Sequence, residues 1–416
     1  MKRYLSTKPV LSDRVKGVEY SETLRVNDRQ NELIAQGKDV VKLGFGEADY
    51  PCSQQFVDGL AEASREGRSR YTNCAGTLEI RESAAEAWKT YIRTNGFRSP
   101  PTGEVYPVYT ADEVLAGPGT KSLMFSAMAA LCNPEDEVVL HRPYWTYPDM
   151  VKISGAKVNV VQSRQEDGFR LTKDLLEDSL TEKSKLLIIN SPNNPTGQVF
   201  SKKDLKGIID VAMSHGLFVL SDEIYGLVTY DDVEHHSIAS LGDDDFLQQC
   251  IVTTGMSKAY SMGGWRLGFA FVKNKELYNA MKNIASNTYT APASMIQDAC
   301  VGFANVQDEV VKMREDYSRR RDVIYQGFLR LGFDVLEPKG AFYMFPKVSQ
   351  HFGKKYKGRP IENSSDFAMA LLEEGVGSNP GKPFGSDNHI RICFVEPVER
   401  LEEECRRIEK FVNSLD

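Results

Sequence analysis

Residues 254–268 read Thr254-Gly255-Met256-Ser257-Lys258-Ala259-Tyr260-Ser261-Met262-Gly263-Gly264-Trp265-Arg266-Leu267-Gly268, with a lysine and an arginine eight positions apart. The stretch follows a short apolar run that is typical of a strand. A lysine amine condenses with an aldehyde as a Schiff base, and a guanidinium binds a phosphate dianion. Lys258 and Arg266 therefore suit an aldehyde cofactor that carries a phosphate, held where open α/β sheets bind ligands. The alternative is a surface lysine in a Gly/Ser loop.

Apolar runs alternate with longer amphipathic stretches between about residues 50 and 300. This alternation predicts an α/β fold, with a mostly parallel sheet covered by helices. Several of the runs are continuously apolar, as strands buried on both faces are. We place strands at 113–116, 137–140, 157–161, 186–189, 218–220, 251–253 and 267–272, and helices at 121–131 and 203–215.

The pattern changes after about residue 300. A charged stretch at 308–331 predicts one long helix that leads into 335–346, and two further helices are predicted at 365–374 and 399–415. A chain of 416 residues is too long for one small core. We therefore expect a large cofactor-binding domain, 49–301, and a smaller α+β domain that both termini form, 1–48 and 302–416.

The composition points to a small-molecule partner. The net charge is −7, and the Lys and Arg residues are spread along the chain, so neither nucleic acid nor an anionic membrane is favoured. No apolar run is long enough to span a bilayer, and charged residues interrupt any signal sequence near the N-terminus. The seven cysteines are scattered without CxxC pairs, which argues against a disulfide framework and against a zinc site. We expect a reduced, cytoplasmic protein without a bound metal.

Polar residues follow three other predicted strands. Asn194 lies in the turn Ser191-Pro192-Asn193-Asn194-Pro195-Thr196-Gly197, and Asp222 ends the apolar run that begins at Phe218, with Tyr225 close behind. The turn Gly117-Pro118-Gly119-Thr120-Lys121 joins a strand to a helix, whose first N–H groups can bind phosphate. A plain turn and a helix cap are the alternatives for the first two.

These residues together meet the requirements of pyridoxal 5′-phosphate. The cofactor requires a carboxylate beside its ring nitrogen, a donor to its ring oxygen, a lysine for its aldehyde and an anion site. A neighbouring negative charge keeps the pyridine nitrogen protonated, and Asp222 is the candidate for that role.

In their order along the chain, segments from 43–51 to 389–394 resemble the class I/II (fold type I) aminotransferases that use pyridoxal phosphate. The resemblance implies that Lys258 forms the Schiff base, that Asp222 pairs with the ring nitrogen, and that Asn194 and Tyr225 donate to the ring oxygen. It also implies cofactor contacts by Gly119, Thr120, Lys121, Trp145, Ser257 and Arg266, with Trp145 stacked on the ring and most of the others at the phosphate.

Arg391 lies within the apolar run 390–395, where an unpaired charge is costly, so it requires an anion. The resemblance implies a bidentate pair with the substrate α-carboxylate, with Gly46, Trp145 and Asn194 also at the substrate. A structural salt bridge is the alternative. By the same resemblance, Tyr71 reaches the phosphate in a partner subunit, which implies a homodimer.

The function that the resemblance implies is transfer of an amino group between an L-amino acid and a 2-oxo acid, with Lys258 as both cofactor anchor and proton shuttle. Elimination of a sulfur leaving group, decarboxylation, cyclisation and oxidation run on the same scaffold, so they remain open. A non-catalytic cofactor-binding module is a more remote alternative. Aspartate, aromatic, alanine-type and specialised substrates all remain open, since 286–292 offers no arginine for a second carboxylate.

Three places depart from the family pattern. Gly255 stands where many relatives have a serine, 97–107 is longer than the corresponding connection, and Ser378 and Asn379 replace a usually apolar pair. The sequence assigns no role to the last two.

Overall fold

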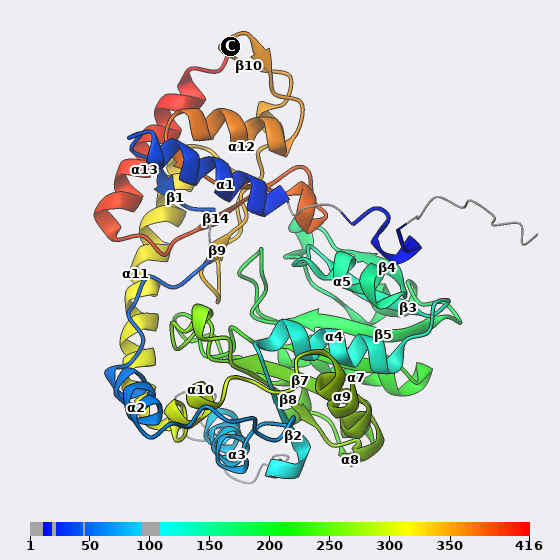
Figure 1. The fold of residues 1–416 in the computed structure, drawn as a ribbon. Coiled ribbons are helices and arrows are strands. Elements are labelled where there is room, and N and C mark those ends of the chain that lie inside the picture. The colour runs from blue at the N-terminus through cyan, green and yellow to red at the C-terminus, as the bar shows by residue number, and fades with distance from the viewer. Residues whose placement is uncertain (1–10, 19–21, 45, 94–108) are drawn as a thin grey trace, which may run out of the picture.

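The computed structural model describes residues 11–18, 22–44, 46–93 and 109–416. These residues form a large lobe around a seven-stranded sheet and a smaller lobe above it in the view of Figure 1. The segment 97–107 lies outside the described residues.

One sheet organises the large lobe, with the strand order β2-β8-β7-β6-β5-β3-β4. Neighbours are parallel from β7 across to β4, whereas β8 runs antiparallel to both β7 and β2. The prediction of an α/β fold with a mostly parallel sheet is therefore confirmed. The strands are β2 (Val114–Gly117), β3 (Glu137–Arg142), β4 (Lys157–Gln162), β5 (Ser184–Asn190), β6 (Phe218–Asp222), β7 (Cys250–Gly255) and β8 (Gly268–Val272).

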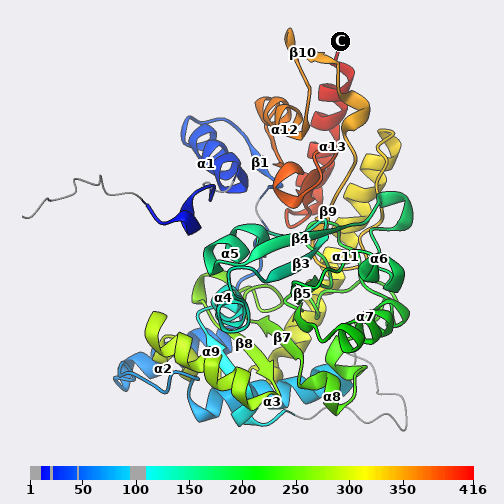
Figure 2. The same cartoon turned by 90° about the vertical axis from the view of Figure 1, so that its right-hand side faces the viewer.

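Successive side chains of these strands join different apolar clusters. On β3, Val138 and Leu140 belong to a cluster with residues of α4 (Thr120–Leu131), α5 (Tyr147–Ser154) and α9 (Lys275–Thr288), as expected for alternate positions on one face. Val139 belongs to the other cluster, with residues of α6 (Lys173–Glu177) and α7 (Lys202–His215). Figure 2 shows the two sets of helices on opposite sides of the strands. Burial on both faces explains the continuously apolar runs in the sequence.

The smaller lobe brings the two ends of the chain together. In this lobe β1 (Val41–Lys42) pairs in parallel with β12 (Val376–Gly377), and β13 (Asn379–Pro380), β14 (Ile390–Cys393) and β9 (Tyr343–Met344) form an antiparallel sheet. Helices α1 (Glu22–Ala35), α11 (Gln307–Arg330), α12 (Ser364–Glu373) and α13 (Val398–Asn413) surround these strands (Figure 1). These pairings support the predicted division into 49–301 and 1–48 with 302–416, which stays a prediction.

Each predicted strand and helix is present, with ends that differ by a few residues. In the segment 335–346 the only regular element is the short strand β9. The remaining α-helices and strands are α2 (Gln54–Arg65), α3 (Leu78–Arg93), α8 (Asp244–Leu247), α10 (Ser294–Ala299), β10 (Lys355–Tyr356) and β11 (Arg359–Pro360).

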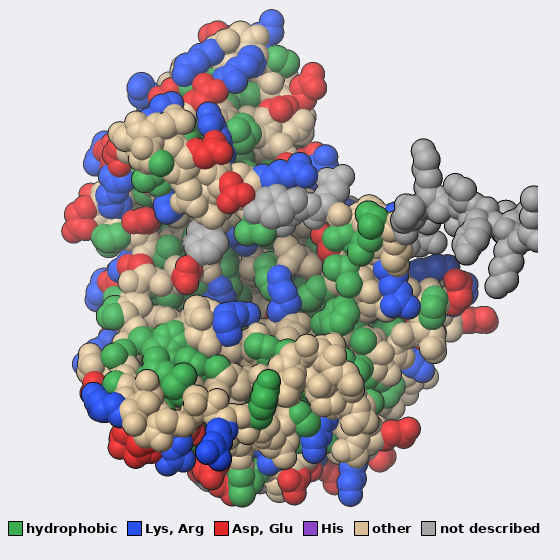
Figure 3. All heavy atoms as spheres, in the orientation of Figure 1, with side chains coloured by type: hydrophobic (Ala, Val, Ile, Leu, Met, Phe, Trp, Pro, Cys, Tyr) green, Lys and Arg blue, Asp and Glu red, His purple; other side chains and the backbone are tan. Residues whose placement is uncertain are grey.

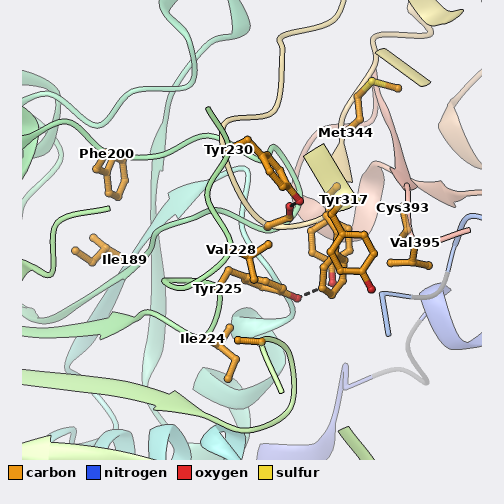
Figure 4. Packing of buried hydrophobic residues seen from close by; sticks show 14 of the residues in the cluster. Ile189, Phe200, Ile224, Tyr225, Val228, Tyr230, Tyr317, Met344, Cys393 and Val395 are labelled. Carbon is orange, nitrogen blue, oxygen red and sulfur yellow. Dashed lines mark hydrogen bonds between the residues drawn. The ribbon is translucent and has the colours of Figure 1, made fainter. Parts of the chain in front are cut away.

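One apolar core passes through both lobes. Tyr225 and Tyr230, which follow β6, belong to the same buried cluster as Tyr317 of α11 and Cys393 of β14. Figure 4 shows these side chains facing one another across the junction of the lobes. The shared core fixes the position of the small lobe over the carboxyl ends of the parallel strands.

Three further observations bear on the chemistry that the chain can carry. Among the described residues, no helix combines the length and the apolar character that a membrane crossing requires. The same residues contain no cluster of three His, Cys, Asp or Glu side chains arranged to bind a metal ion. All seven cysteines are free.

Glu404 of α13 is fully buried, and neither carboxylate oxygen has a hydrogen-bond partner in the described part of the chain. Burial, with help from the charge of Glu396, raises the pKa of Glu404 well above its ordinary value. When the pKa of a carboxyl is higher in the folded state than in the unfolded state, the free energy of unfolding decreases as the pH rises above about 4.5. We therefore expect Glu404→Met to raise the melting temperature, and to raise it more at pH 8 than at pH 5.

Thermal unfolding at the two pH values measures this effect. Glu409→Met on the exposed side of the same helix is the control, for which no pH-dependent gain is expected. An equal gain from Glu404→Met at both pH values would show that Glu404 has an ordinary pKa.

Candidate active site

A cavity of about 610 Å³ lies between the two lobes. Figure 3 shows the hollow from outside, with Lys and Arg side chains beside it. All but two of the residues predicted from the sequence line this cavity. They are Gly46, Thr120, Lys121, Trp145, Asn194, Asp222, Tyr225, Ser257, Lys258, Arg266 and Arg391.

The sheet explains this convergence. Trp145 follows β3, Asn194 follows β5, Asp222 ends β6 and Lys258 follows β7. These strands are parallel, so their carboxyl ends lie along one edge of the sheet. Because β8 is antiparallel, Arg266 just before it lies at the same edge.

Lys258 is held by the segment that connects the lobes. Its Nζ donates a hydrogen bond of 2.5 Å to the carbonyl oxygen of Gly46 and lies 5.6 Å from the ring of Tyr225. Burial, followed by the nearby charge of Arg391, lowers the pKa of Lys258 to about 8. A larger share of this amine is therefore unprotonated near neutral pH than for an ordinary lysine, which favours its use as a nucleophile or base.

Asp222 is almost completely buried at the base of the cavity, 3% exposed. The Tyr147 hydroxyl donates to Oδ2 at 2.8 Å, and the Ile224 backbone N–H donates to Oδ1 at 3.3 Å. Burial raises the pKa of Asp222 to about 6, although the hydrogen bond from Tyr147 acts in the opposite direction. No helix starts at this residue, so the helix-cap alternative is wrong. Such a carboxylate is suited to pair with a cation that enters the cavity.

The hydroxyl groups of Tyr225 and Tyr343 lie 2.6 Å apart and join the two lobes. The dashed line in Figure 4 starts at the Tyr225 hydroxyl. Burial raises the pKa of Tyr225 well above its usual value, so its hydroxyl stays protonated and can donate. A Cβ on Gly46 would lie 2.0 Å from the Tyr343 hydroxyl oxygen, so only glycine fits at that position.

One end of the cavity is cationic. Arg266 donates to the carbonyl oxygens of Gly263 at 2.9 Å and Pro118 at 3.3 Å, which places its guanidinium against the first turn of α4. A Cβ on Gly119 would meet the Arg266 guanidinium at 2.5 Å, and Gly119 has a φ of +81°. Lys121 Nζ lies 4.4 Å from the centre of the Trp145 ring, and burial with the charge of Arg266 lowers the pKa of Lys121. Two cations beside a helix N-terminus form an anion site.

Arg391 lies on β14 in the wall formed by the small lobe. Its guanidinium donates to Asn194 Oδ1 at 3.0 Å and to the Gly44 carbonyl oxygen at 2.7 Å, and it lies 4.6 Å from the ring centre of Tyr343. Within the described ranges no carboxylate pairs with Arg391, and its buried Nε has no hydrogen-bond partner. The structural salt bridge is therefore absent among these residues, and the guanidinium retains donor capacity for an anion from outside the chain.

Two predicted residues do not line the cavity. Gly119 packs against the Arg266 guanidinium, which itself lines the cavity. Tyr71 is 92% exposed and lies at a separate hollow of about 680 Å³, beside residues of α2 and α10. The chain does not bring Tyr71 to its own cavity.

Tyr147, Tyr343 and Asn379 are among the residues of the cavity wall that the sequence did not identify as site residues. Asn379 is the β13 partner of Arg391, and its Nδ2 donates to the Gly44 carbonyl oxygen. Tyr147 stands two positions after Trp145, so a scan of the whole post-strand segment could have found it. Tyr343 and Asn379 lie in two-residue strands without a motif, so only the fold identifies them.

The glycine at position 255 has a structural reason. A Cβ there would lie 2.8 Å from Gly268 Cα and 2.9 Å from the Leu267 carbonyl oxygen. Because β7 and β8 approach so closely, a serine at 255 would require the strands to move apart.

Comparison with known proteins identifies the family. The model of the family "aminotransferase class I and II" matches residues 38–408. The chain is 34% identical to an aspartate aminotransferase from Bacillus sp. (strain YM-2) over 97% of its length and 100% of the relative's. It is also 34% identical to a probable aspartate/prephenate aminotransferase from Rickettsia felis, over 98% of this chain and 97% of the relative.

The solved structure of the Thermus thermophilus aspartate aminotransferase with maleate superimposes with a TM-score of 0.87 at 32% identity, over 97% of this chain and 100% of that one. A match of that extent includes both lobes. It favours amino-group transfer over the other reactions of this scaffold and over a non-catalytic module. The protein belongs to the class I and II aminotransferases and is an enzyme of that family.

Proposed function

We propose that the protein uses pyridoxal 5′-phosphate to transfer an amino group between aspartate and a 2-oxo acid. The observation that carries the proposal is the convergence on one cavity of a lysine of lowered pKa, a buried carboxylate and a buried arginine that has no counter-ion among the described residues. These groups match an aldehyde, a ring nitrogen and a carboxylate, respectively.

The residues present fit the phosphate of this cofactor. Thr120 and Lys121 at the start of α4, Ser257 and Arg266 line one end of the cavity, and Gly119 leaves room for the Arg266 guanidinium. We assign phosphate binding to this cluster, with Arg266 as its bidentate donor.

The middle of the cavity fits the ring. Asp222 would hold the ring nitrogen in its protonated form, Trp145 would stack on one face, and Asn194 and Tyr225 would donate to the ring oxygen. Asn194 Oδ1 accepts from Arg391, which leaves its amide N–H₂ for that donation. When bound, the cofactor supplies an electron-withdrawing ring that stabilises negative charge at the substrate carbon.

The remaining residues act on the substrate. Arg391 would bind the α-carboxylate and so aim the Cα–H bond, with Gly46 leaving space beside it. Lys258 would hold the cofactor aldehyde, and its Nζ would be the group that takes up and gives back the Cα proton of the substrate. The carbonyl oxygen of Gly46 holds Nζ in place for these two tasks.

Aspartate is the substrate that we propose, because the names of the relatives described above include it.

A panel of L-amino acids, each mixed with the enzyme in a single turnover without a 2-oxo acid, tests this assignment. We expect aspartate to convert the bound cofactor from its aldehyde to its amine form fastest, with one oxaloacetate per site. Release of ammonia or carbon dioxide without that conversion would contradict transamination. Faster conversion by an aromatic amino acid would contradict only the choice of aspartate as the substrate.

The assembly that we propose is a homodimer in which Tyr71 reaches the phosphate of the partner subunit. Its support is the exposure of Tyr71 together with exposed apolar residues nearby on α2 and α3, Val57 and Leu78. We also propose the cytoplasm as its location, on the evidence of seven free cysteines.

Arg391→Lys tests the substrate role. Lysine keeps the charge but loses the two-pronged geometry, so we expect the KM for aspartate to rise about 10- to 100-fold, while the absorbance of the bound cofactor stays unchanged. Arg321→Lys is the matched control: Arg321 is equally buried but paired with Asp231, and its loss should lower the melting temperature without raising KM. An unchanged KM in Arg391→Lys would remove Arg391 from the substrate site.

A further inference from the structure

Tyr147 is a buried residue at the start of α5, 2% exposed, and neither the family motifs nor the roles above include it. Its hydroxyl donates to Asp222 Oδ2 at 2.8 Å, while Oδ1 accepts from the backbone N–H of Ile224 at 3.3 Å. One donor on each oxygen fixes both the direction and the rotation of the carboxylate plane.

The same side chain contacts a second cavity residue. The rings of Tyr147 and Trp145 are edge to face, with centroids 5.6 Å apart and an interplanar angle of 83°. The Tyr147 backbone N–H also donates to the carbonyl oxygen of Trp145 at 2.6 Å. Tyr147 therefore touches both the acid and the indole that face the cofactor in the proposed site.

We propose that Tyr147 is a positioning residue that keeps Asp222 ionised and oriented for the ring nitrogen and sets the angle of the Trp145 ring. This inference rests on the proposed function. A buried carboxyl that lacks donors takes up a proton, and a neutral acid does not stabilise a protonated ring nitrogen. The tyrosine supplies a donor without adding a second charge to the site.

The other groups that face Asp222 do not replace this donor. Glu223, next along the chain, carries a like charge that favours the neutral form of Asp222, and the Lys258 charge opposes it. The Glu223 carboxylate is itself held by the hydroxyls of Ser221 and Ser237, at 2.9 and 2.8 Å. Buried Tyr225 remains protonated, and its hydroxyl lies against Tyr343. Tyr147 is thus the side-chain hydrogen-bond donor to Asp222 among the described residues.

Tyr147→Phe removes the hydroxyl and keeps the ring. We expect the dissociation constant for pyridoxal phosphate to rise about tenfold, the effect of one hydrogen bond to a charged group. Tyr278→Phe is the control, since Tyr278 is buried in the same apolar cluster but donates to the Val114 carbonyl oxygen at 3.3 Å. The control should leave the dissociation constant unchanged.

A second measurement uses the protein without cofactor. The folded pKa of Asp222, about 6, lies above its ordinary value of 3.8, so this carboxyl loses stabilising free energy as the pH rises through that window. Removal of the Tyr147 donor raises the folded pKa of Asp222 further, so the decrease in the free energy of unfolding continues to higher pH. The melting temperature of Tyr147→Phe should therefore lie further below that of the wild type at pH 8 than at pH 5, whereas the deficit of Tyr278→Phe should not change with pH.

Asp222→Asn separates the possible failures. If Asp222→Asn weakens cofactor binding and the double variant with Tyr147→Phe binds the cofactor about as weakly as Asp222→Asn alone, the two residues act as one unit and the proposal stands. If Asp222→Asn weakens binding but Tyr147→Phe alone does not, the positioning role is wrong and the proposed function is unaffected. If neither variant changes cofactor binding, the proposed role of Asp222 fails as well.

Discussion

Lys258→Ala is expected to lower the turnover number by at least about 10⁴-fold and to abolish the visible absorbance of a lysine-bound cofactor. The amine has two tasks in the proposed mechanism, since it binds the aldehyde and then moves the Cα proton, and alanine performs neither. Its surroundings are built for these tasks: the Gly46 carbonyl oxygen holds Nζ, and burial with the charge of Arg391 lowers the pKa of Lys258 to about 8.

Borohydride reduction followed by peptide mass analysis measures the attachment directly. The wild-type enzyme should carry the reduced cofactor on the peptide that contains Lys258, and the variant should carry none. Lys273→Ala is the control, because Lys273 at the end of β8 forms an ion pair with Glu113 away from the cavity. A variant at position 258 that retained the spectrum, or a label found on another lysine, would refute the assignment.

Asp222→Ala is expected to retain the lysine-bound cofactor but to lose turnover on the order of 10³-fold. Without the carboxylate the ring nitrogen loses its proton, and the ring then withdraws electrons poorly from the substrate carbon. The effect should appear in the rate of Cα proton removal, measured with substrate that is deuterated at Cα.

The pH dependence of cofactor binding gives an independent test. Burial raises the pKa of Asp222 to about 6, so the carboxylate of the cofactor-free enzyme becomes neutral below that pH. The affinity of the wild type for the cofactor should fall as the pH drops below about 6, and Asp222→Ala should not show this fall. Asp204→Ala removes a buried carboxylate of α7 that pairs with Arg170, and this variant should behave as the wild type does.

The sequence predicted most of the large lobe because its strands carry the signal within themselves. Runs such as 186–189 are apolar at every position, and this occurs where helices cover both faces of a parallel sheet. Parallel strands end at one edge, so the sequence alone groups the residues at their carboxyl ends, Asn194, Asp222 and Lys258. The strands of the small lobe were harder to predict, because β1, β9, β12 and β13 have two residues each and are too short for a periodic pattern.

The residues of the candidate site also fall into those that the sequence predicts and those that only the fold identifies. Residues that stand in motifs after strands were found, whereas Tyr147, Tyr343 and Asn379 were missed because their roles depend on contacts with residues distant in sequence. The Ser378 and Asn379 pair was noted as a departure from the family pattern, and the fold places Asn379 beside Arg391.

The sequence by itself determined the class of fold, the family and the identities of the reactive groups, because chemistry depends on residue type and the alternation of strands and helices is visible as a local pattern. Only the tertiary structure decided the state of those groups. The lowered pKa of Lys258, the raised pKa of Asp222 and the unpaired Nε of Arg391 among the described residues all depend on burial in the folded chain. Desolvation and hydrogen bonding act through space, so the feature that makes Lys258 a reactive amine appears only when the chain has folded around it.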